Sequence, residues 1–262
     1  MGSIPIARSK FFLPLDTNHC DERLECSAYG RDLCGDVGVG LPSLAAGILS
    51  GEVGDGAILE PLRWRLNSVE VNYTFRRIAS EELLLLWAEA TPAHFCFAVK
   101  AHQRITHVKR LRDVAESTVE CLASLEALRK AKKLGPVLFQ LPPNFKCDVQ
   151  RLREFLASLP SWVRAAFEFR HESWLGEEVY EALRKDGAAL CLAESEGLVT
   201  PEVVTADFSY LRLWKESHST NAVAQKGRRL ARNGDVFVYF KHEETPQGAL
   251  RAEALLHAVR EK

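Results

Sequence analysis

The sequence lacks long hydrophobic runs. Its uninterrupted apolar stretches, such as Leu83–Ala88, fall well short of the roughly 18 residues that a membrane-spanning helix needs. It also lacks an excess of charge, because 34 Lys and Arg residues stand against 35 Asp and Glu residues and give a formal net charge of -1. No global electrostatic field therefore draws the protein to nucleic acid or to an anionic membrane, and we expect no membrane partner.

Paired cysteines are absent as well. The seven cysteines are an odd number and are scattered, and Cys20, Cys26 and Cys34 are too far apart to form a C-x-x-C pair. This pattern argues against a disulfide framework and against a zinc or iron–sulfur site. The start of the chain has no apolar segment followed by a small-residue cleavage site, so a cytoplasmic location is the expectation.

Hydrophobic residues make up 47% of the 262 residues, and from about residue 36 they form short strand-like runs separated by helical stretches. The last seven expected strands start about 28 residues apart, close to the spacing of a barrel with eight strand–helix units in about 250 residues. We therefore predict a TIM-type (β/α)8 barrel, an α/β fold, as a single domain over 36–262, preceded by an extension of unknown order over 1–35; a doubly wound sheet is the alternative. The expected strands are 37–40, 68–75, 95–100, 137–141, 165–170, 189–194, 208–213 and 236–241, and the expected helices are 81–90, 111–133, 148–160 and 177–185.

Alternation along the expected strands separates two sets of side chains. The bulky apolar set should pack under the helices, which leaves the other set facing the barrel axis. Near the end of each strand that set is polar, and barrel enzymes build their active sites at this carboxyl-terminal rim. The side chains expected there are Glu70, Asn72, Lys100, Gln140, Glu168, Arg170, Arg212, Tyr239 and Lys241, joined by Glu194 and Glu196 if the backbone turns at the end of its strand.

The expected rim carries more positive than negative charge. Four cations, at positions 100, 170, 212 and 241, face two carboxylates, at positions 70 and 168. A desolvated pocket of this charge favours a small anionic partner such as a phosphate or carboxylate. The alternative is an ion-pair network whose role is structural.

The same residues offer acid–base chemistry. Glu70 or Glu168 would act as general base and Lys100, His107 or His171 as acid, which fits a hydrolase, lyase or isomerase. Trp174 would stack on a substrate at the mouth. The residues leave the cofactor unknown: the glycines at 35, 38 and 40 lack the G-x-G-x-x-G order of a dinucleotide site, and a divalent metal held by Glu70, Glu168, Glu194 and His171 is disfavoured by the neighbouring cations.

Two other functions stay open. The basic stretches 104–112 and 226–232 would serve a nucleic-acid-binding or nucleic-acid-processing protein as a phosphate track leading to the mouth. A barrel with a purely structural rim would instead be a non-catalytic module that binds a ligand or a partner. The sequence does not set the oligomeric state.

Seven ordered segments of the chain resemble the YecE-like proteins, known as domain of unknown function 72. They are 69-VEVNYTF-75, 97-FAVKAHQRITHVKRL-111, 135-GPVLFQLPPNFKCD-148, 167-FEFRHESW-174, 193-AESEG-197, 205-TADFSYLRLW-214 and 235-DVFVYFKHEETPQG-248. The resemblance covers about residues 60–262 and implies a TIM-type barrel, but it supplies no reaction. It points to Glu70, Asn72, Lys100, Thr106, His107, Gln140, Glu168, Arg170, His171, Trp174, Glu194, Glu196, Arg212 and Lys241, whereas 37-VGVGLPSLAAG-47 departs from the first-strand motif of the family.

Overall fold

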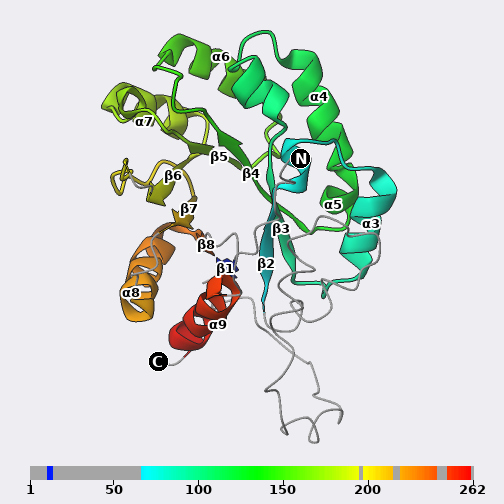
Figure 1. Ribbon diagram of the computed structural model, residues 1–262, viewed down its shortest axis with the longest axis vertical. Helices are drawn as coiled ribbons and strands as arrows, with labels where there is room; N and C mark the ends of the chain where they lie inside the picture. Colours follow the sequence, from blue (N-terminus) through cyan, green and yellow to red (C-terminus); the bar gives the residue numbers. More distant parts are fainter. Residues whose placement is uncertain (1–10, 14–65, 195–196, 215–218, 241–246, 261–262) are drawn as a thin grey trace, which may run out of the picture.

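The computed structural model describes residues 11–13, 66–194, 197–214, 219–240 and 247–260. Seven parallel strands in sequence order curve into a nearly closed barrel, which confirms the predicted TIM-type architecture (Figure 1). Each strand pairs with the next along the chain, as expected when a helical connection returns to the same end of the sheet. The strands are β2 (Ser68–Val71), β3 (Cys96–Lys100), β4 (Leu134–Gln140), β5 (Ala165–Glu168), β6 (Ala189–Glu194), β7 (Phe208–Leu213) and β8 (Asp235–Phe240).

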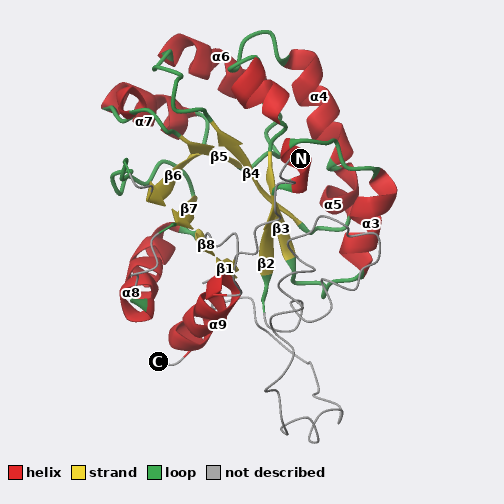
Figure 2. Cartoon of the chain, in the orientation of Figure 1, coloured by secondary structure: helices red, strands yellow, loops and turns green. Residues whose placement is uncertain are grey.

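The helices lie on the outside of the barrel (Figure 2). Two of them begin with a side-chain cap: Ser80 Oγ accepts a hydrogen bond from the Leu83 amide at 3.3 Å, and Asp148 Oδ1 accepts one from the Arg151 amide at 3.1 Å. The helices described are α3 (Glu81–Glu89), α4 (Ala115–Ser124), α5 (Glu126–Lys130), α6 (Val149–Ser158), α7 (Glu177–Lys185), α8 (Thr220–Leu230) and α9 (Gln247–Arg260).

Alternation along the strands produces two separate cores. The outer core, between the sheet and the helices, contains large side chains such as Phe97, Phe139 and Phe167. The inner core fills the barrel and uses many small residues, which leave room for a few aromatic rings. Its buried members are Ala98, Leu138, Ala166, Ala189, Cys191, Ala193, Phe208, Tyr210, Phe237 and Tyr239.

Two expected elements differ from the structure. The strand expected over 68–75 ends at Val71, and a 3-10 turn, η1 (Tyr73–Phe75), follows it. The helix expected over 111–133 is two helices, α4 and α5, preceded by a π-helical turn, η2 (Arg104–Val108). The helix cannot start at residue 111 because Leu111 and Asp113 have positive φ angles of 64° and 50°.

The predicted extension over 1–35 contains a short strand, β1 (Phe11–Leu13). It pairs antiparallel with β8, with Phe11 opposite Val238. The strand expected over 37–40 lies outside the described residues.

Candidate active site

A buried polar layer crosses the barrel at the carboxyl ends of its strands. Five side chains from five strands form it, and none is more than 6% exposed. All five belong to the set that alternation directs toward the barrel axis, so this part of the sequence prediction is confirmed. They are Glu70 on β2, Lys100 on β3, Gln140 on β4, Glu168 on β5 and Arg212 on β7.

Arg212 lies at the centre of this layer. Its Nη2 donates to Glu70 Oε1 at 3.0 Å and its Nη1 donates to Glu168 Oε2. Both ends of the guanidinium therefore hold a carboxylate, and all three side chains are almost completely removed from solvent. Buried charges persist only when they are paired in this way.

Glu168 accepts three side-chain hydrogen bonds. Gln140 Nε2 donates to Oε1 at 2.7 Å and Arg170 Nε donates to the same oxygen at 3.0 Å, in addition to the contact from Arg212. Lys100 Nζ donates to Gln140 Oε1 at 2.8 Å, which joins the lysine to the network. Direct contacts thus join Lys100, Gln140, Glu168, Arg170 and Arg212 of the predicted rim residues.

The charge state of Glu168 follows from these contacts. Burial by itself would raise its pKa, but the charges and hydrogen bonds of Arg212 and Arg170 outweigh burial and lower the pKa to about 2. A carboxylate with so low a pKa is a poor proton acceptor at neutral pH. We therefore assign Glu168 to holding the arginines in place, in contrast to its expected role as general base.

Glu70 also accepts hydrogen bonds from two uncharged side chains. Tyr210 donates from its hydroxyl to Glu70 Oε2 at 2.8 Å, and Asn72 Nδ2 donates to Glu70 Oε1 at 3.2 Å. Tyr239 is completely buried in the inner core, 3.2 Å from the Ser68 hydroxyl at the start of β2. Tyr239 therefore lies below the polar layer and not at the rim where it was expected.

His107 comes to the site from the π-helical turn η2. Its Nδ1 is 2.9 Å from Thr106 Oγ1, and its ring contacts the Phe75 ring edge-to-face with centroids 4.9 Å apart. Lys100 Nζ lies 3.8 Å from the centroid of the same Phe75 ring, so the histidine and the lysine share one aromatic neighbour. Burial and the charges of Lys100 and Arg170 lower the pKa of His107 to about 4, which makes the imidazole neutral at physiological pH.

Replacing Lys100 by methionine is expected to raise the pKa of His107 from about 4 toward its ordinary value of 6.5. The substitution removes a nearby positive charge while burial continues to hold the pKa below 6.5. NMR titration of the imidazole protons checks this result, with His107→Gln to assign the signal. Lys146→Met, at an exposed lysine, is the control that should leave the titration unchanged. Equal pKa values of His107 in the wild type, Lys100→Met and Lys146→Met would show that the charge of Lys100 does not act on His107.

The remaining predicted residues lie elsewhere. His171 is turned toward its own loop, where its Nδ1 lies 2.8 Å from Ser173 Oγ. Trp174 is completely buried in the outer core, stacked on Phe169 with ring centroids 4.8 Å apart, so neither face of the indole is open to a substrate as predicted. Glu194 shares the strand face of outer-core residues and ends β6 in a bridge to Val199. Glu196 and Lys241 lie outside the described residues.

Two aromatic residues of the site were missed. Phe75 lies beneath Lys100, and Trp214 lies beneath Arg170, whose Cζ is 4.9 Å from the indole centroid. Both follow a strand end, which is the signal that identifies rim residues in a barrel. Cation–π contacts of this kind hold a charged side chain in place without neutralising it.

The four side chains considered above as ligands of a divalent metal make other contacts or lie apart. Within the described part of the chain, no three His, Cys, Asp or Glu side chains are grouped so that they could hold a metal ion. Glu70 and Glu168 instead hold Arg212, and His171 is bonded to Ser173. No described helix has the length and apolar character needed to cross a membrane.

The two basic stretches lie at opposite ends of the barrel. Residues 104–112 follow the carboxyl end of β3, whereas residues 226–232 precede the amino end of β8. In the second stretch, Arg229 and Lys226 both pair with Glu202, at 2.8 and 3.8 Å. The expectation that both stretches form one track to the same mouth is therefore wrong.

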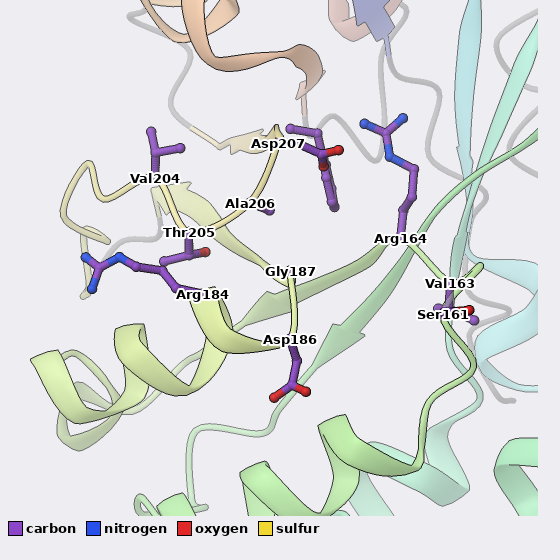
Figure 3. Close-up of a pocket in the computed structure, with 11 residues that line it drawn as sticks. Ser161, Val163, Arg164, Arg184, Asp186, Gly187, Val204, Thr205, Ala206 and Asp207 are labelled. Carbon is purple, nitrogen blue, oxygen red and sulfur yellow. The ribbon is translucent and has the colours of Figure 1, made fainter.

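A cavity of about 540 Å³ lies at the amino-terminal end of the barrel, and Figure 3 shows the residues that line it. Arg164, Gly187 and Asp207, which precede β5, β6 and β7, are among its lining residues. Arg164 Nη1 pairs with Asp235 Oδ2 at 2.8 Å, and its Cζ lies 4.5 Å from the Phe208 ring centroid. Arg164 therefore lies against an inner-core ring at the amino-terminal end of the barrel. The cavity is at that end, whereas the candidate site is at the carboxyl-terminal end.

Comparison with known proteins agrees with this architecture. The DUF72 family protein EF0366 of Enterococcus faecalis V583 has a similar structure, with a TM-score of 0.69 and 17% identity over 79% of this chain and 94% of that one. The DUF72 family protein TM1631 of Thermotoga maritima MSB8 has a TM-score of 0.66 and 26% identity, covering 75% of this chain and 85% of that one.

Sequence comparison leads to the same group. The UPF0759 protein YunF of Bacillus subtilis is 31% identical over 123 residues, a match that spans 43% of this chain and 42% of YunF. The family described as "Protein of unknown function DUF72" matches residues 48–262, which include every parallel strand that the structure describes. The chain therefore belongs to the DUF72 family.

Proposed function

We propose that the protein is an enzyme that binds a small anionic molecule, bearing a phosphate or a carboxylate, at the carboxyl-terminal mouth of the barrel. The observation that carries the proposal is the charge of the polar layer and its rim. Lys100, Arg170 and Arg212 supply three positive charges among the described residues, and Glu70 and Glu168 supply two negative charges, both of which are held by Arg212. The excess positive charge favours an anionic ligand.

Arg170 is the side chain best placed to contact this ligand. It uses Nε to hold Glu168 and packs over Trp214, and its side chain remains 28% exposed. A guanidinium fixed at Nε presents its two terminal nitrogens in the fork that recognises phosphate and carboxylate oxygens. The Nε of Arg212 is a further buried donor with no hydrogen-bond partner in the described part of the chain, and an oxygen of the ligand would satisfy it.

His107 is the group best suited to move a proton. Its imidazole is neutral at physiological pH, and Thr106 orients the ring through Nδ1, which directs Nε2 away from that contact. A bound anion would offset the charges of Lys100 and Arg170 and so raise the pKa of His107 toward the working pH, where proton transfer is most efficient. Hydrolysis, elimination and isomerisation of an anionic substrate all use such a transfer.

Binding of simple anions tests the proposal. Phosphate, sulfate, citrate and a sugar phosphate are titrated while thermal unfolding is followed, and a ligand at about 100 times its dissociation constant should stabilise the protein by about 2.7 kcal/mol. Arg170→Ala is expected to remove this stabilisation. Arg153→Ala is the matched control, because Arg153 pairs with the exposed Glu178 on the helical surface and should leave it unchanged.

The same titration separates the alternatives. Stabilisation that is equal in wild type and Arg170→Ala, or absent for every anion, would overturn the anion-binding mouth and support a structural ion network in a non-catalytic barrel. Binding of single-stranded nucleic acid with a steep salt dependence, and none of small anions, would support the nucleic-acid function instead.

A further inference from the structure

The loop that carries His107 has an unusual backbone. It begins with the π-helical turn η2 and continues through Arg110, Leu111 and Asp113, whose φ angles are 49°, 64° and 50°. Such angles are costly for residues other than glycine, and both π turns and left-handed residues concentrate at functional sites. Leu111 is buried and secures the loop, while Arg110 stays partly exposed. The strained conformation thus holds Arg110 in a defined place.

Arg110 shares an aromatic neighbour with a second arginine. The Cζ atoms of Arg110 and Arg151 lie 5.9 and 5.3 Å from the centroid of Phe145. Arg151 Nη1 also donates to the Arg110 carbonyl at 3.4 Å. Phe145 is buried and fixed, since its carbonyl accepts a hydrogen bond from Trp174 Nε1 at 2.7 Å. Two guanidinium groups are therefore each placed against the ring of Phe145, which we call the platform.

The charge of this platform is only partly balanced. Arg151 Nη2 pairs with Asp148 Oδ2 at 2.8 Å, and Arg110 makes no ion pair with any described residue. Two positive charges around one aromatic ring, with one carboxylate to balance them, favour an anion bound beside that ring. The pair therefore has the composition of an anion subsite.

The platform is close to the barrel mouth. Arg110 is on the same loop as His107, and the charge of Arg110 acts with those of Lys100 and Arg170 in lowering the pKa of His107. The carboxyl ends of β3 and β4 lead directly into the two loops that carry Arg110 and Phe145. His107 is therefore within electrostatic range of both Arg110 and the mouth cations Lys100 and Arg170.

We propose that Arg110 and Arg151, packed around Phe145, form a second anion subsite, and that the natural ligand is a small molecule with two anionic groups, one in the mouth and one on this platform. The inference rests on the proposed function, because it takes the mouth as the first subsite. Two linked groups bind more tightly than one when the protein places a site for each at the right separation.

The experiment measures dissociation constants by calorimetry at constant ionic strength for inorganic phosphate, inorganic pyrophosphate and fructose 1,6-bisphosphate. At least one of the two-phosphate probes should bind about tenfold more tightly than inorganic phosphate. Arg110→Gln and Arg151→Gln should each bring this ratio close to one. Arg104→Gln is the control, because Arg104 is exposed on the same loop and lies outside both subsites, and it should keep the ratio of the wild type.

The two proposals fail in different ways. If Arg170→Ala removes phosphate binding while the ratio is the same in wild type, Arg110→Gln and Arg151→Gln, the second subsite is overturned and the first stands. If no probe binds in a manner that depends on Arg170, both are overturned. Two independent variants are used so that poor folding of one, seen as a loss of cooperative melting, still leaves a decisive measurement from the other.

Discussion

Replacing Arg212 by methionine is expected to lower the free energy of unfolding by about 3–5 kcal/mol, the usual effect of removing one partner from a buried ion pair. Arg212 is completely buried and holds both Glu70 and Glu168. The methionine fills much of the same volume, so packing changes little. The loss comes from two carboxylates that stay in the barrel without their common partner.

Urea denaturation of the purified proteins measures this loss. Arg153→Met is the matched control, because Arg153 and Glu178 form an exposed pair whose removal should cost less than about 1 kcal/mol. Adding Glu168→Gln to Arg212→Met should recover part of the stability, since it removes one of the unpaired charges. A loss in Arg212→Met no larger than in the control would mean that solvent reaches the polar layer.

The free energy of unfolding at acidic pH gives a second test of the ion pairs between Arg212 and Glu168. The pKa of Glu168 is about 2 in the folded protein against an ordinary value of 4.5, so the unfolded chain binds a proton in this range and the folded protein does not. The resulting stability, on the order of 3 kcal/mol, is present above about pH 4.5 and is lost as the pH falls toward 2. Arg212→Met should flatten this part of the profile because the pKa of Glu168 is then no longer held down by Arg212.

Much of the polar layer was predictable because strand alternation fixes direction. In a parallel barrel, residues of one parity on every strand face the axis, so Glu70, Lys100 and Glu168 could be brought together from three distant segments without any coordinates. The position of each side chain along the barrel axis was harder to predict from the sequence. Neighbouring strands in a barrel are staggered, and Tyr239, near the end of its strand, comes to lie beside Ser68 at the start of β2.

Pairing within the layer could not be read from the sequence. The prediction counted cations and carboxylates but did not identify Arg212 as the residue that holds both carboxylates. That arrangement depends on side-chain reach across the barrel, which alternation does not describe. The pKa of Glu168, and hence its unsuitability as a base, follows from the pairing and not from the residue types.

Loops after the strands were the least predictable part of the site. The basic stretch 104–112 was expected to serve as a phosphate track, but its backbone conformation was not predicted: it forms a π turn followed by left-handed residues. A π turn followed by left-handed residues produces no periodic pattern of hydrophobic residues from which it could be predicted. The aromatic residues that follow strand ends could be recognised as rim candidates, but the sequence does not say which of them face a ligand and which, like Trp174, return to the core.

Replacing Trp174 by alanine is expected to lower the free energy of unfolding by about 3–5 kcal/mol, as large-to-small changes at buried aromatic positions do. The indole is completely buried, stacks on Phe169 and lies edge-to-face against Phe145 with centroids 5.3 Å apart. The alanine would leave a cavity in the outer core and an unsatisfied carbonyl at Phe145. Chemical denaturation measures the change.

Trp174→Phe separates packing from ligand binding at this position. Phenylalanine retains most of the stacking but cannot donate to the Phe145 carbonyl, so about 1–3 kcal/mol should be lost. Exposed Trp162→Phe is the control and should cost little. Because the indole lies outside the barrel and beneath the rim, Trp174→Phe should bind inorganic phosphate with the affinity of the wild type. Loss of phosphate binding with wild-type stability would contradict this assignment and return Trp174 to the ligand site that the sequence predicted.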